Sequence, residues 1–223
     1  MFGKISILGC GLIGSSILRA IEEKRLATKI SVHDKSNKVT EYLKKNFTVD
    51  ICSNVNETTN DADLVIISSP LSSYKEILLS IKSTLKEGSI LTDTGSAKKE
   101  VNKIVNNLGF KNISWIASHP IAGTEYSGPA AGFSSLFRDR WCILSADNQV
   151  AKDKIENLEK FWSKLGSKVK TNSSQVFRLL AKSGILVRKM DVYGIKNSLR
   201  ITIGTTSENI ALIKKLRKIL NVR

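Results

Sequence analysis

Lys4–Ser16, with the sequence KISILGCGLIGSS, holds the pattern on which the architecture of the chain depends. A short apolar run leads into the glycine series Gly9, Gly11 and Gly14. A second run, KISVHD, ends at Asp34, twenty positions after the last of these glycines. This order is typical of a strand, a phosphate-binding turn, a helix and a second strand. The sequence therefore predicts a dinucleotide-binding βαβ unit.

Each residue of this pattern has a physical role. Gly9 allows the tight turn, Gly11 lets the backbone approach a pyrophosphate, and Gly14 lets the helix pack closely on the sheet. The start of the helix offers free N–H groups and a positive dipole end to phosphates. Asp34 can accept hydrogen bonds from ribose hydroxyls and repels a 2′-phosphate, so it favours NAD over NADP. A glycine-rich turn in an unrelated α/β protein is the alternative, and the acid at the expected offset argues against it.

Strand and helix patterns alternate along the chain as far as about residue 169. Strands are expected at 4–8, 30–33, 49–51, 63–68, 89–91, 113–117 and 141–144, with a last one from 169; helices are expected at 13–23, 38–46, 72–85, 97–108 and 150–165. This alternation predicts an α/β fold with a doubly wound, mostly parallel Rossmann-like sheet. Ligands of such sheets bind at the carboxyl ends of the strands.

Composition indicates a globular cytoplasmic protein. The chain has 223 residues, of which 41% are hydrophobic and 25% charged, both ordinary values. No apolar run approaches the ~18 residues of a membrane span, and the N-terminus leads directly into a strand, so neither a membrane anchor nor a signal peptide is expected. Cys10, Cys52 and Cys142 lack metal-ligand spacing, which indicates reduced thiols and no metal site.

Positive charge is concentrated near the C-terminus. The net charge of +15 divides into +3 over residues 1–150 and +12 over residues 151–223. Such a skew is compatible with a nucleic-acid surface. The lysines are scattered without interleaved aromatic residues, however, so a solvated face is favoured and nucleic-acid binding is not expected.

Three motifs follow the later strands: SSP at 68–70, DTGSAK at 93–98 and SHPIAGTE at 118–125. His119 lies at the expected carboxyl end of a strand, inside a loop rich in proline and glycine, which favours a functional role over a structural one. Ser96 also suits the N-cap of the helix that follows it. The other histidine, His33, is expected to face solvent.

GCGLIGSS, Asp34, SSP, DTGSAK and above all SHPIAGTEYSG resemble the prephenate and arogenate dehydrogenases over residues 1 to about 172. The resemblance implies NAD-dependent oxidative decarboxylation of a small-molecule substrate, prephenate or arogenate, in tyrosine biosynthesis. It implies that His119 accepts the hydroxyl proton, that Ser96 binds the same hydroxyl, and that Gly123 and Thr124 shape the loop around the substrate ring. The implied cofactor-binding residues are Gly9, Gly11, Leu12, Ile13, Gly14, Asp34, Ser69, Pro70 and Gly95.

Residues 173–223 depart from this family, whose members continue into a helical domain that forms a dimer and binds substrate carboxylates. Here the pattern GILVR…YG…LRITIGT…EN resembles the end of a histidinol-phosphate-type aminotransferase. A small α+β tail is expected, with helices at 177–182 and 207–220 and strands at 185–188 and 199–203. The lysine that binds pyridoxal phosphate and the large domain are absent, so transamination is excluded and Arg200 becomes a relic or surface residue. A gene fusion is the inferred history, and a homo-oligomer is compatible with it.

Two functions from different classes remain open. The first is a working NAD-dependent dehydrogenase of domain 1–172, with Arg188, Arg200 or nearby lysines of the tail supplying cations for the substrate. The second is a remnant that binds NAD without significant turnover.

Overall fold

The glycine loop follows the central strand β1 in the computed structural model, which describes residues 2–147, 149–170, 180–189, 199–200 and 204–220. The chain divides into two units, Met1–Val169 and Lys170–Arg223. The first unit contains the glycine loop and both cavities that matter below.

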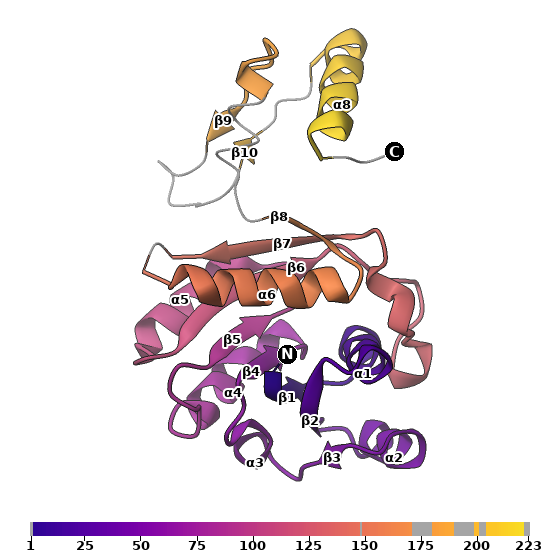
Figure 1. The fold of residues 1–223 in the computed structure, drawn as a ribbon, viewed down its shortest axis with the longest axis vertical. Helices are drawn as coiled ribbons and strands as arrows, with labels where there is room; N and C mark the ends of the chain where they lie inside the picture. Colours follow the sequence, from indigo (N-terminus) through magenta and orange to yellow (C-terminus); the bar gives the residue numbers. More distant parts are fainter. Residues whose placement is uncertain (1, 148, 171–179, 190–198, 201–203, 221–223) are drawn as a thin grey trace. The chain divides into compact units, whose positions relative to one another are not determined.

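The sheet of eight strands has the order β3-β2-β1-β4-β5-β6-β7-β8 (Figure 1). The strands are β1 (Phe2–Leu8), β2 (Ala27–His33), β3 (Asp50–Ile51), β4 (Leu64–Ile67), β5 (Ile90–Asp93), β6 (Ser114–Pro120), β7 (Trp141–Ala146) and β8 (Lys168–Lys170). All pairings from β3 to β6 are parallel, and β6 pairs with β7 in antiparallel orientation. The predicted doubly wound, mostly parallel α/β fold is confirmed.

Helices connect these strands much as the sequence predicts. They are α1 (Leu12–Lys24), α2 (Asn37–Asn46), α3 (Val55–Thr59), α4 (Tyr74–Ile81), α5 (Lys98–Leu108) and α6 (Lys152–Lys164), with short 3₁₀ helices η1 (Leu71–Ser73), η2 (Pro129–Ala131) and η3 (Ser134–Phe137). The single α-helix predicted over 72–85 is confirmed only over residues 74–81. Residues 72 and 73 form the end of η1, and the helix gives way to a turn after Ile81, where the N–H groups of Thr84 and Leu85 both bond to the Ile81 carbonyl.

Strand β4 explains why both faces of the sheet carry helices. Its four residues are all buried, but successive side chains point to opposite faces. Leu64 and Ile66 belong to the apolar cluster that includes α1 and α6, whereas Val65 and Ile67 belong to the cluster that includes α4 and α5. A continuous apolar strand of this kind requires cover on both sides. Because helices cover both faces of the sheet, a ligand reaches it at the ends of the strands, and in folds of this kind it binds at the carboxyl ends.

The close packing of α1 on the glycine loop depends on Gly14. A Cβ atom at Gly14 would overlap the carbonyl oxygen of Gly9, a backbone atom that cannot move aside easily. We expect Gly14→Ala to destabilise the fold by about 2 kcal/mol, which corresponds to a loss of roughly 4–8 °C in melting temperature. Thermal unfolding followed by circular dichroism measures this effect.

Gly11→Ala is the matched control in the same loop. Nothing lies within 4 Å of a Cβ atom at Gly11, so its cost is limited to about 1 kcal/mol for a poorer N-cap. Equal melting temperatures for the two variants would contradict the packing role of Gly14.

The second unit contains a short antiparallel pair, β9 (Arg188–Lys189) with β10 (Leu199–Arg200), and the helix α8 (Thr206–Leu220). Thr205 and Glu208 form a capping box at the start of α8, in which Oγ1 of Thr205 accepts from the Glu208 N–H at 3.4 Å and Oε2 of Glu208 accepts from the Thr205 N–H at 2.7 Å. The predicted helix at 207–220 is confirmed.

The other predictions for the tail fall partly outside the described residues. Residues 180 and 181 are helical, whereas 177–179 of the predicted helix and 201–203 of the predicted strand are not described. The predicted strand at 185–188 is confirmed only at its last residue, which begins β9. The side chains of Arg188 and Arg200, proposed sources of cations, also lie outside the described set.

Among the described residues, no helix combines the length and the apolar character that a bilayer crossing requires.

Candidate functional site

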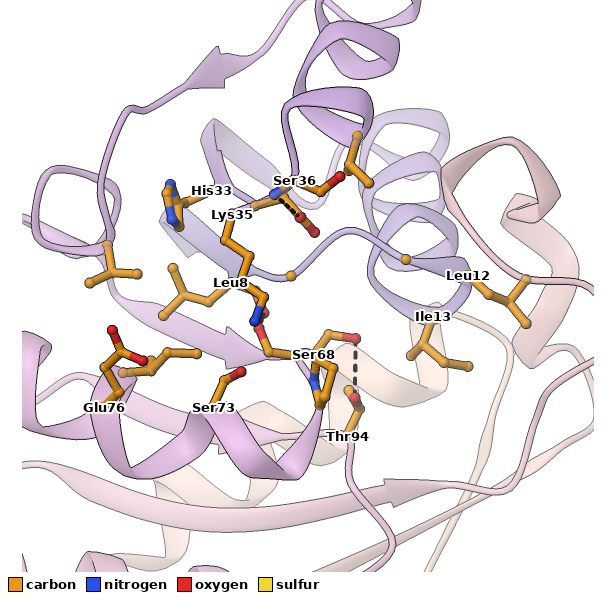
Figure 2. A pocket seen from close by; sticks show the side chains of 18 of the residues that line it. Leu8, Leu12, Ile13, His33, Lys35, Ser36, Ser68, Ser73, Glu76 and Thr94 are labelled. Atoms are coloured by element: carbon orange, nitrogen blue, oxygen red, sulfur yellow. Dashed lines mark hydrogen bonds between the residues drawn. The ribbon is translucent and has the colours of Figure 1, made fainter.

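A cavity of about 570 Å³ lies at the carboxyl ends of β1, β2 and β4 (Figure 2). The strand order reverses between β1 and β4, because β2 lies on one side of β1 and β4 on the other. A crevice at such a switch point is the usual ligand site of this fold. Seven residues predicted to bind the cofactor line it: Gly9, Gly11, Leu12, Ile13, Asp34, Ser69 and Pro70.

The glycine loop forms the wall of the cavity between β1 and α1. Gly9 has a φ of +93°, which favours glycine, and an added Cβ would lie 2.5 Å from the Ser69 hydroxyl oxygen. Gly11 is open, so a ligand can approach its backbone closely. Helix α1 begins at Leu12 without a side-chain cap. Its first N–H groups are therefore available to an anion at this end of the cavity.

Asp34 follows β2, and hydrogen bonds to two backbone N–H groups hold its carboxylate in place beside the glycine loop. Its Oδ2 accepts from the Cys10 N–H at 2.8 Å. Its Oδ1 accepts from the Ser36 N–H at 2.9 Å, the bond dashed beside Ser36 in Figure 2. Each carboxylate oxygen has a further lone pair for a ligand hydroxyl. Lys35 also lines this part of the cavity. The result is a fixed negative charge at the position where the fold places a ribose.

His33 differs from the prediction. It lines the same cavity and is half-buried, with its Nδ1 atom 3.1 Å from the Cys52 carbonyl oxygen. The expectation that it faces solvent is wrong, because the ring lines the cavity and its Nδ1 atom lies against the backbone carbonyl of the residue that follows β3.

Two hydroxyl-group hydrogen bonds join the end of β4 to its neighbours on the far wall of the cavity, one to β5 and one to β1. Thr94 donates to Oγ of Ser68 at 3.1 Å (Figure 2), and the Ser69 hydroxyl donates to the Leu8 carbonyl at 3.0 Å. These bonds fix the SSP motif between β1 and β5. Gly14 and Gly95, also predicted to bind the cofactor, do not line this cavity; Gly14 is buried under the loop.

A second, more open cavity of about 360 Å³ lies at the end of β6. His119 lines it together with Pro120, Ile121, Ala122, Gly123 and Arg140. Thr124, predicted to contact substrate with Gly123, is exposed beyond this lining, where its Oγ1 accepts from the Tyr126 N–H at 3.2 Å. Because β4, β5 and β6 are adjacent and parallel, the two cavities open at the same edge of the sheet.

An ion pair between the half-buried Lys98 and the buried Asp93 lies beside His119. The Lys98 ammonium contacts Oδ1 of Asp93 at 2.5 Å and donates to the Ser118 carbonyl at 2.5 Å. The same carboxylate accepts from the Ser118 N–H at 3.3 Å and from the Gly95 N–H at 3.1 Å. Burial raises the pKa of Asp93, and the Lys98 charge opposes this effect. Because Lys98 and Asp93 both hydrogen-bond to the Ser118 backbone, the pair fixes the ends of β5 and β6 relative to each other.

This arrangement favours a neutral imidazole at His119. Partial burial lowers the pKa of His119, and the Lys98 charge lowers it further, while Asp93 acts in the opposite direction. A neutral imidazole can accept a proton at neutral pH. We expect the His119 ring to titrate with a midpoint below 6.5 in proton NMR, with a His33→Gln variant to assign the two histidine signals.

Lys98→Met removes the positive charge and leaves the Asp93 carboxylate without its partner, so the His119 midpoint should rise. Lys103→Met, on the exposed face of the same helix, is the matched control and should leave the midpoint unchanged. A wild-type midpoint above 6.5, or equal midpoints in the two lysine variants, would contradict this electrostatic account.

Ser96 lies in the exposed loop between β5 and α5 and lines neither of these two cavities. Its predicted role as a helix N-cap is wrong, because α5 begins at Lys98 with Ala97 in the cap position. No hydrogen bond within the described part of the chain engages its hydroxyl.

Sequence reasoning missed Asp93, Lys98 and Arg140 as parts of the site. Asp93 and Lys98 belong to the DTGSAK motif, and a buried acid beside a lysine five residues later was an available signal. Arg140 gave none, because only the pairing of β6 with β7 brings it near His119. Among the described residues, no cluster of histidine, cysteine and acidic side chains suits a metal ion.

Comparison with known proteins gives two distinct results along the chain. A family model described as prephenate dehydrogenase, nucleotide-binding domain, matches residues 17–171. Cyclohexadienyl dehydrogenase of Zymomonas mobilis is 32% identical over 176 residues, which cover 78% of this chain and 60% of that protein. The chain spans less than two thirds of the length of the curated dehydrogenases that it matches.

The C-terminal part is similar to other proteins. Histidinol-phosphate aminotransferase 1 of Psychrobacter arcticus is 42% identical over 50 residues, or 22% of this chain and 13% of that protein. Among solved structures, the prephenate dehydrogenase of Aquifex aeolicus in complex with hydroxyphenyl propionate and NAD⁺ superposes with a TM-score of 0.69 at 20% identity, covering 99% of this chain and 80% of that chain. This similarity supports the fold.

Proposed function

Because the chain belongs to the prephenate dehydrogenase nucleotide-binding domain family, we propose that its first unit binds NAD and oxidises prephenate or arogenate with loss of CO₂. The observation that carries this proposal is the placement of two cavities at one edge of the sheet. The first has a glycine loop and a fixed acid, and the second has a half-buried histidine.

The first cavity fits NAD by three features. The open space at Gly11 and the free N–H groups of α1 suit the pyrophosphate, and Asp34 suits the ribose hydroxyls. Ser69 and Pro70 line the side toward β5, where the nicotinamide ribose would lie. Leu12 and Ile13 supply apolar contacts, and the buried Gly14 keeps the helix close to the loop. The NAD⁺ complex of the Aquifex enzyme supports this assignment.

NAD, when bound, would accept a hydride from the ring carbon that bears the substrate hydroxyl. His119 is the base that accepts the hydroxyl proton as the carbonyl forms. The bond to the ring carboxylate then breaks, CO₂ leaves, and its electron pair completes the aromatic ring. Ser96, on the loop after β5, hydrogen-bonds the same hydroxyl, and Gly123 and Thr124 shape the loop over the ring. The backbone N–H of Gly95 is held by Asp93 and keeps this loop in place.

We further propose that the chain arose by fusion of two coding sequences. The second unit supports this because the C-terminal part of the chain is similar to an aminotransferase over only 13% of that protein. Thr205 and Glu208 belong to the GILVR…YG…LRITIGT…EN pattern. Because they form the capping box of α8, these two residues have a structural role here. Transamination is not proposed for the second unit.

The test is addition of prephenate, and separately of arogenate, to the full chain with NAD while absorbance at the NADH wavelength is followed. NADH formation with either substrate supports the proposal, and the faster substrate identifies the preference. NAD binding without NADH formation would favour the alternative, a remnant that retains the cofactor and has lost turnover.

A further inference from the structure

Arg140 borders the His119 cavity from the position directly before the neighbouring strand β7. The backbone on both sides of it is fixed by hydrogen bonds. The Arg140 N–H donates to the Phe137 carbonyl at 3.1 Å, and the Arg140 carbonyl accepts from the Lys168 N–H at 2.8 Å. The Trp141 carbonyl accepts from the Ile121 N–H at 2.7 Å. Arg140 therefore keeps its place at the mouth of the cavity, opposite the loop that follows His119.

The Arg140 guanidinium has no acidic partner within the described part of the chain. The adjacent acid, Asp139, contacts Lys168 instead, with 3.3 Å between Oδ1 and Nζ. The six residues that line the cavity include one cation, Arg140, and one imidazole, His119, but no carboxylate. An open cavity with this charge pattern attracts an anion that carries a hydrogen-bonding group for the histidine.

We propose that Arg140 binds a carboxylate of the same ligand whose hydroxyl group contacts His119, an inference that rests on the proposed function. A guanidinium presents its N–H groups in a fixed fork that matches the two oxygens of a carboxylate. The ligand class is thus a small hydroxy acid, and the proposed function supplies the six-membered ring that separates its hydroxyl and carboxylate. The first unit then carries its own cation for the substrate, independent of Arg188 and Arg200.

The experiment is calorimetric titration of the full chain, loaded with NAD, with 3-(4-hydroxyphenyl)propionate and with its uncharged amide. NAD binding is titrated separately in the same samples. Arg140→Gln removes the charge, Arg140→Lys keeps it without the fork, and Arg138→Gln removes an equal charge from an exposed arginine two residues away that does not line the cavity.

Wild type should bind the acid more tightly than the amide, and Arg140→Gln should raise the Kd for the acid about tenfold or more while the Kd for the amide stays unchanged. Arg140→Lys should fall between these, and Arg138→Gln should match wild type. Equal losses in Arg140→Gln and Arg138→Gln, an unchanged preference for the acid in Arg140→Gln, or no acid binding by an NAD-loaded chain would overturn the inference. Failure to bind NAD would instead refute the proposed function on which it rests.

Discussion

His119→Asn is expected to reduce NADH formation by roughly 10²–10⁴-fold, the usual contribution of a general base, while NAD affinity stays within about twofold of wild type. Asparagine keeps a polar group of similar size on β6 but cannot accept a proton at neutral pH. His119 lines the second cavity and not the cavity assigned to the cofactor. The variant should therefore separate chemistry from cofactor binding.

Initial rates of NADH formation and calorimetric titration with NAD measure the two effects. His33→Asn is the matched control, because His33 lines the cofactor cavity and has no place near the substrate. It should retain turnover and alter NAD affinity only. Comparable turnover in His119→Asn and wild type would remove the proposed base from the mechanism.

Asp34→Ser is expected to shift cofactor preference from NAD toward NADP by roughly 10²-fold. The substitution removes the carboxylate that accepts from the ribose, and bonds to charged groups are worth about 1.5–3 kcal/mol each. It also removes the repulsion of a 2′-phosphate, and Lys35 and Ser36 already line this part of the cavity. NAD should bind more weakly and NADP more tightly, as measured by titration with each cofactor.

Asp50→Ser is the control for the change in net charge, since Asp50 is exposed at the start of β3, away from the cavity. It should leave both affinities unchanged. The Asp34 carboxylate also holds the Cys10 N–H, so the melting temperature of each variant is recorded. An unchanged preference in a folded Asp34→Ser chain would contradict the ribose assignment.

Local patterns carry most of what the sequence predicts here. The GxGxxG motif and the acid twenty residues later describe one βαβ unit, and the hydrogen bond that joins its loop to its acid, from the Cys10 N–H to Asp34, spans only 24 residues. Strand β4 is recognisable because four consecutive apolar residues suit burial on both faces. Helix α3 was missed because it is five residues long and depends on the Asn54 side chain, which accepts from the Glu57 N–H at 2.9 Å.

The parts of the site that were missed depend on tertiary pairing. Lys98 contacts Asp93 because the loop between them folds back at the sheet edge, and both then meet the backbone of Ser118 on the next strand. Arg140 reaches the His119 cavity because β7 turns antiparallel to β6, with Pro120 opposite Cys142. No spacing rule in the sequence specifies that turn. The sequence alone therefore could not predict that Arg140 and His119 line one cavity.

The most direct test of the central claim is calorimetric titration of NAD into the full chain and into Gly11→Ala. The account predicts one-site binding to the wild-type chain and a clear loss of affinity in the variant, because a methyl group at Gly11 fills the space through which the pyrophosphate approaches the backbone. Absence of NAD binding by a folded wild-type chain, or equal affinity in the two chains, would contradict it.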